Sequence, residues 1–245
     1  MKKYLVVMLL SLSFNVIDAQ NISQGGATNT KSSLGSISLD PSAVYDIDGN
    51  KKGFNYADVG GSPFLFDDWR LANIYDDHLK KFAVVKVRLN TYSNQIHFLD
   101  SKGQELIADK DSIKRIEVLK KSGDNEVEFV FEKGFSAGKS LLALDEFVEV
   151  LNTGSVQLLK QVKNKIIEKD SLLGTAKIIK FSSLATYFLN TKTSCERLKR
   201  LDQPEIFALL SNKDIIAEFE KNNKQKLRKE KDVIEFLNYY NSYNH

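Results

Sequence analysis

The chain has 245 residues, of which 42% are hydrophobic and 27% charged; this balance is typical of a globular protein and excludes a largely disordered one. Its formal net charge of +3 excludes an overall basic field that would demand nucleic acid or anionic lipid. Its single cysteine, Cys195, excludes an internal disulfide, so the apolar core must stabilise the fold.

The N-terminus has the three parts of a secretory signal peptide. Two lysines precede an apolar run from Tyr4 to Phe14, and Ala19 supplies a small residue at the cleavage position. The run is shorter than the roughly 20 residues that a membrane-spanning helix needs. We therefore expect residues 1–19 to be removed on export to the periplasm or the medium. An uncleaved anchor or a buried helix is the alternative.

The remaining chain divides into three parts by composition. Residues 20–42 are rich in Asn, Ser, Thr and Gly, which favours a flexible leader. Residues 43–190 predict a β-rich domain, and residues 191–245 predict a helical C-terminal region. The fold class is therefore α+β and mainly β.

Alternating apolar and polar residues predict a series of strands separated by short turns. The cleanest pattern is Val127, Phe129 and Phe131, which alternate with glutamates. A hairpin is expected around Asn152-Thr153-Gly154, and Tyr187–Leu189 is expected to be the last strand. The other expected strands lie at residues 82–92, 95–100, 105–108 and 113–118. Sequential strands with short turns predict an antiparallel meander, either an open sheet or a partly closed barrel.

Helical signals begin after residue 190. Asp202 is a candidate N-cap with Glu205 three residues later, and Ser211 repeats this arrangement with Asp214. Apolar residues at helical spacing then form one stripe along residues 230–243. Helices this short are marginal alone, so we expect them to pack on the β-rich domain.

Three segments resemble a family of exported bacterial proteins that is common in the Bacteroidota. They are Gly61-Ser62-Pro63-Phe64-Leu65, then Val87-Arg88-Leu89-Asn90-Thr91-Tyr92, and Gln95-Ile96-His97-Phe98. The C-terminal pattern at residues 211–219 and 230–240 is also similar. The resemblance implies export, a β-rich region and a helical ending. It implies no catalytic residue, because the family has no established function.

A basic segment joins the last two expected helices, and one tryptophan stands apart in the β-rich region. The residues proposed to bind a partner are Lys224, Lys226, Arg228, Lys229 and Trp69. Clustered basic side chains concentrate anions, so the partner would be another envelope protein or an anionic envelope polymer. A solvated helix junction is the alternative.

Two acidic pairs flank the only tryptophan. Paired carboxylates serve as acid and base in glycoside hydrolysis, and tryptophan stacks on sugars. These residues, Asp67, Asp68, Asp76 and Asp77, suggest a carbohydrate-active hydrolase as an alternative function. Neighbouring residues of a strand point to opposite faces, however, which favours an ordinary role in turns and strand ends.

The remaining motifs predict no cofactor and no metal. Residues 134–140 approach a phosphate-binding loop but have only three residues between the glycines. Residues 46–50 approach a calcium loop but place glycine too early. Cys195 would need a nearby base to act as a nucleophile. The histidines lack the spacing of metal ligands, and His97 is expected on the exposed face of its strand.

The sequence therefore predicts an exported envelope or secreted protein with a binding or structural role rather than a catalytic one.

Overall fold

The structure is a computed structural model of the chain. It describes residues 34, 36–37, 43–45, 51–123, 125–137, 141–170, 177–223 and 226–243. The expected signal peptide, the calcium-like segment at 46–50, Lys224 and the last residues of the phosphate-loop-like segment lie outside the described residues.

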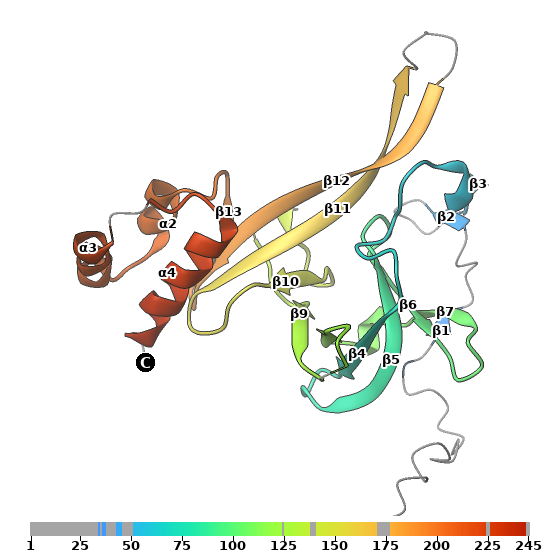
Figure 1. Cartoon of the computed structure of the whole chain (residues 1–245), viewed down its shortest axis with the longest axis horizontal. Coiled ribbons are helices and arrows are strands. Elements are labelled where there is room, and N and C mark those ends of the chain that lie inside the picture. The colour runs from blue at the N-terminus through green and yellow to red at the C-terminus, as the bar shows by residue number, and fades with distance from the viewer. Residues whose placement is uncertain are drawn as a thin grey trace, which may run out of the picture. The chain divides into compact units, whose positions relative to one another are not determined.

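Strands dominate the described chain, and helices follow near its C-terminus (Figure 1). In chain order the elements are β1 (Ser36–Ile37), β2 (Ala43–Tyr45), β3 (Lys51–Asn55), the short helix η1 (Tyr56–Asp58), β4 (Arg70–Tyr75), β5 (Lys81–Asn90), β6 (Gln95–Leu99), β7 (Glu105–Ala108), η2 (Lys110–Ser112), β8 (Arg115–Leu119), β9 (Val127–Glu132), β10 (Val148–Val150), β11 (Gln157–Asp170), β12 (Lys177–Asn190), β13 (Cys195–Leu198), α2 (Gln203–Leu209), α3 (Lys213–Asn222) and α4 (Glu230–Ser242).

Eleven of the described strands form one antiparallel sheet, and β2 pairs with β3 separately. The strand order is β1-β7-β6-β5-β4-β8-β9-β10-β11-β12-β13, so most neighbours in sequence are neighbours in space. The sheet is open because its order runs from β1 to β13 without closing. The predicted fold class, mainly antiparallel β with a small helical region, is confirmed.

The first apolar cluster lies on one face of β4–β9. Phe129 and Phe131 of β9 stand opposite Val118 and Ile116 of β8, as their alternation with glutamates predicts. The expected leader contributes to this cluster, because Leu34 is buried within it. Ser36–Ile37 also pairs with β7 as an edge strand. These three residues of the expected leader therefore contact the β-rich part of the chain.

The hairpin of β11 and β12 is longer than the sequence patterns indicate. Each strand has 14 residues, and they pair without a register shift from Gln157–Asn190 to Asp170–Lys177. The expected last strand, Tyr187–Leu189, is only the end of β12, and β13 follows it. In the half of the hairpin that lies farther from the helices, polar and apolar residues occupy both faces of each strand. The alternation of apolar and polar residues therefore does not reveal the full length of these strands in the sequence.

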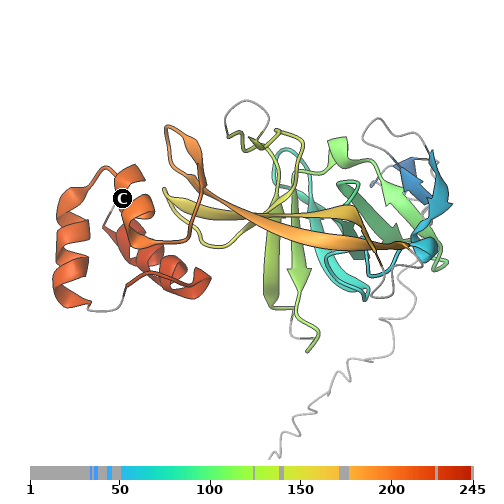
Figure 2. The ribbon, with the colours of Figure 1, turned by 90° about the horizontal axis from the view of Figure 1, so that it is seen from above.

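Helix α4 packs against the base of this hairpin and α3 packs against α4, so that the second apolar cluster joins strands to helices (Figures 1 and 2). Asp202 caps α2 by accepting from the Glu205 amide, as expected. The cap of α3 is Asn212 rather than Ser211, since its side chain accepts from Ile215. The predicted stripe of α4 is confirmed, with Val233, Phe236, Leu237 and Tyr240 buried. Among the described helices, none has the length and apolar content to cross a membrane.

Candidate functional site

A pocket of about 500 Å³ lies where β11 passes the turn between β5 and β6. The loop before β10 forms a third wall. Backbone hydrogen bonds fix this arrangement. The backbone N–H of Asn164 on β11 donates to the backbone oxygen of Thr91 at 3.1 Å, and the backbone N–H of Thr91 donates to the backbone oxygen of Pro63 at 2.9 Å. Two segments of the family resemblance, Gly61–Leu65 and Val87–Tyr92, thus meet beside the pocket.

Apolar side chains from β5, β6, β9, β11 and the loop before β10 line the pocket. Leu89 and Ile96 come from the paired strands β5 and β6, and both are buried. Phe131 comes from β9, Phe147 from the loop before β10, and Val162 from β11. These residues can bury an apolar group of a ligand, as the walls of binding pockets commonly do.

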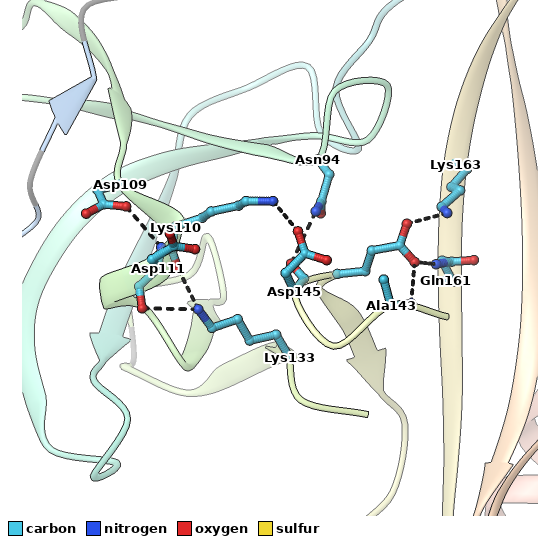
Figure 3. Close-up of polar contacts among 10 residues, drawn as sticks. Asn94, Asp109, Lys110, Asp111, Lys133, Ala143, Asp145, Gln161 and Lys163 are labelled. Carbon is cyan, nitrogen blue, oxygen red and sulfur yellow. Dashed lines mark hydrogen bonds and ion pairs between the residues drawn. The ribbon is translucent and has the colours of Figure 1, made fainter. Parts of the chain in front are cut away.

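Charged and polar side chains surround one side of the pocket (Figure 3). Lys110 of η2 forms an ion pair with Asp145, and the Asn94 side chain donates to the backbone oxygen of Asp145 at 3.2 Å. The hydrogen bond from Lys110 lowers the pKa of Asp145, with burial opposing it. Asn94 adopts a φ of 52°, a left-handed conformation that asparagine tolerates.

Glu146 ties the same loop to β11. Its carboxylate pairs with Lys163, accepts from the Gln161 amide at 2.6 Å and accepts from the Ala143 backbone at 3.2 Å. Figure 3 shows Gln161 and Lys163 side by side on β11, facing this loop. Both carboxylates, Asp145 and Glu146, are therefore neutralised by lysines and positioned by several contacts.

A third carboxylate of the pocket, that of Glu149 on β10, is more buried than those of Asp145 and Glu146. Burial raises the pKa of Glu149, Lys160 opposes this shift, and Glu230 adds to it. Lys160 Nζ lies 3.9 Å from Glu149 and 2.9 Å from Glu230. Because α4 begins at Glu230, this lysine connects the pocket wall to the helical region.

The structure does not bring the four sequence-predicted aspartates together. Asp67 and Asp68 are exposed before β4, where Asp68 pairs with Lys121 at 3.1 Å. Asp76 follows β4 and accepts from two backbone amides of the β4–β5 turn, beside exposed Asp77. The six-residue strand between the pairs separates them by roughly 20 Å. None of the four lines the pocket.

Trp69 lies in a cluster that sequence reasoning missed. The Arg88 guanidinium lies 4.3 Å from the Trp69 ring and 4.0 Å from the Phe64 ring. Arg88 also pairs with Glu105 at 2.9 Å. One face of the tryptophan thus contacts a cation within the protein, which leaves less of the ring for a sugar.

His97 belongs to the same cluster and corrects a prediction. Its side chain is 0% exposed, and its Nδ1 lies 2.7 Å from Glu105 Oε1. The ring packs edge-on against Phe64, with centroids 5.0 Å apart. The expected exposed face of β6 is covered because Phe64 lies over it. Burial opposes the effect, but hydrogen bonds from His97 and Arg88 lower the pKa of Glu105.

The expected partner-binding residues Lys226, Arg228 and Lys229 are exposed between α3 and α4. Leu227 between them is buried, and the backbone amides of Arg228 and Lys229 donate to Asp232. The segment therefore serves as a helix connection, with acidic residues close by. Lys224 lies outside the described residues.

Two further sequence candidates have local explanations. Burial, with Glu196 contributing, raises the pKa of the Cys195 thiol to about 11, which keeps it protonated at neutral pH. His78 is exposed in the β4–β5 turn. Over the residues that the structure covers, no three His, Cys, Asp or Glu side chains are grouped as metal ligands.

Comparison with known protein families, curated proteins and solved structures finds no match to this chain. The pocket is therefore the best-supported candidate site on geometry alone. Its polar residues come from four separate segments, which explains why no sequence motif marks it.

Proposed function

We propose that the protein is an exported, non-enzymatic binding protein of the cell envelope, and that its pocket holds an extended segment of a partner envelope protein. One observation carries the proposal. Apolar walls are combined with two carboxylates, Asp145 and Glu146, that lysines already neutralise. Such a site suits an uncharged amphipathic segment whose apolar side chain is buried and whose backbone meets polar groups.

The edge of β11 supports an extended ligand. β10 pairs with β11 up to Lys160, and the next backbone contact on that edge is from Asn164 to Thr91. Val162 lies between them, within the pocket. On this edge, opposite β12, no described strand pairs with β11 at Val162, so the backbone of this residue can join an incoming strand.

Photo-cross-linking in living cells tests this proposal. A photoreactive phenylalanine at Asn94, beside the pocket, should give one discrete adduct whose partner is identified by mass spectrometry. The substitution Phe147→Ser removes apolar wall area and should abolish the adduct, while a photoreactive residue at Lys226 should not form it. An adduct that persists in Phe147→Ser would exclude the pocket as the binding site.

The hydrolase alternative has its own test. The purified protein would be incubated with envelope polysaccharides, and release of reducing ends would be measured. Turnover that is lost in Asp68→Asn or Asp76→Asn would refute a purely binding role.

A further inference from the structure

The register of the β11–β12 hairpin places a lysine on every rung of one face of its outer half. Strand residues two apart share a face, and paired residues share it too. We call this surface the basic face. Its rungs are Lys163–Leu184, Lys165–Ser182, Ile167–Lys180 and Lys169–Ile178.

The opposite face of the same segment differs in charge and in packing. Its rungs are Asn164–Ser183, Ile166–Phe181, Glu168–Ile179 and Asp170–Lys177. It carries both acidic residues of the segment, and Lys177 pairs with Glu168 at 3.1 Å. Phe181 packs there against Tyr56 and Tyr92, with ring centroids 6.0 and 5.6 Å away. The hairpin therefore has one mixed-charge face that packs on the rest of the fold and one basic face, which meets the loop before β10 where Lys163 pairs with Glu146.

The basic face is open to solvent. Lys165, Lys169 and Lys180 are exposed, and within the described residues no carboxylate pairs with any of them. Two aliphatic side chains on the end rungs of this face are also exposed, Ile178 by 50% and Leu184 by 53%. Exposed aliphatic residues within a lysine cluster are not needed for solubility, and they point to a surface that is covered in use.

We propose that the basic face docks on an anionic lipid surface. Lysine stems extend along apolar surface while their ammonium groups reach lipid phosphates. Ile178 and Leu184 are then free to enter the headgroup region, as the apolar residues of interfacial segments do. An acidic polymer would engage the charges but would gain little from the exposed aliphatic residues. Lys163 and Lys165 of the basic face also line the pocket, but this docking does not require a partner in the pocket.

Co-sedimentation with vesicles tests the proposal. The purified protein should bind vesicles of about 70% phosphatidylethanolamine and about 30% phosphatidylglycerol, and should not bind phosphatidylcholine vesicles. Each lysine near an anionic bilayer strengthens binding about fivefold. The variant K165Q/K169Q/K180Q should therefore bind about 100-fold more weakly. These side chains are exposed, so its melting temperature should match that of the parent.

The matched control is K226Q/R228Q/K229Q, which removes the same charge from the connection between α3 and α4. It should bind anionic vesicles within about twofold of the parent. Equal losses in the two triple variants would show a general charge effect and overturn the proposal. Equal binding to neutral vesicles, or no vesicle binding by the parent, would overturn it as well.

The aliphatic residues separate a lipid surface from a soluble polyanion. I178S/L184S should lose the part of vesicle binding that survives high salt, because salt screens only the charges. Heparin serves as the soluble probe. If K165Q/K169Q/K180Q lost heparin binding but kept vesicle binding, an acidic polymer would replace lipid as the ligand.

Discussion

The side-chain amide of Asn164 donates a 3.1 Å hydrogen bond to the carbonyl oxygen of Ser62. This bond joins the long hairpin to the segment that precedes β4. The residue is only 5% exposed, and its side-chain oxygen accepts from Ser183. Asn164 therefore positions β11 along the edge of the pocket.

Replacing this residue should destabilise the fold. Asn164→Ala leaves the half-buried Ser62 carbonyl without its donor, and such losses cost about 1–3 kcal/mol. Urea unfolding measures the change. Ser183→Ala, which removes only the exposed partner, should cost less than about 1 kcal/mol. Equal effects of the two variants would mean that the bond to Ser62 contributes little.

The Glu105 cluster should make stability depend on pH. Hydrogen bonds from His97 and Arg88 hold the pKa of Glu105 below its usual 4.5, although burial opposes them. A lowered folded-state pKa stabilises the protein above the unfolded value, and this contribution is lost as pH falls through the lowered one. Thermal melts of Glu105→Gln should therefore show a deficit at pH 7 that shrinks in acid. A deficit that stays constant would exclude ionisation as the cause.

Asn241 of α4 should hold the β10–β11 turn against the helix. Its side chain donates to Thr153 O at 2.9 Å and Val156 O at 2.8 Å, and accepts from the Val156 amide at 3.0 Å. Asn241→Ala should cost about 2–3 kcal/mol in chemical denaturation. Asn238→Ala on the exposed side of α4 is the control, and a similar loss there would point to helix propensity instead.

The same contact restricts the turn itself. Gly154 has a φ of 121°, and a Cβ there would lie 2.4 Å from Asn241 Nδ2. Gly154→Ala should therefore destabilise the protein through both backbone strain and this clash. In a double-mutant cycle, Asn241→Ala should relieve part of the cost of Gly154→Ala; strict additivity would contradict the contact.

Cys195 should react slowly with alkylating agents. Its thiol pKa is raised to about 11, chiefly by burial, so little thiolate exists at pH 8. Because the thiolate is the nucleophile, iodoacetamide should react on the order of 100-fold more slowly than with an unperturbed thiol. The rate should rise about tenfold per pH unit up to pH ~11. A plateau near pH 8.5 would show an ordinary thiol.

Local patterns in the sequence predicted much of the fold. The alternation in β9, the cap at Asp202 and the apolar stripe of α4 depend on residues near one another in the chain, and the structure confirms all three. The short turns predicted antiparallel neighbours, which the strand order bears out. The signal peptide and the family resemblance stay predictions.

Tertiary structure decided which polar residues are buried and which meet. His97 lies opposite the apolar residues of its strand, a position that predicts exposure, but Phe64 from another segment packs against its ring. The pocket collects side chains from separate loops and strands, so no spacing in the chain reveals it. The basic face depends on the register between β11 and β12, because a shift of one residue would move every lysine of one strand to the opposite side. Pairing along all 14 residues of each strand sets that register, and the residue pattern of either strand alone does not specify it.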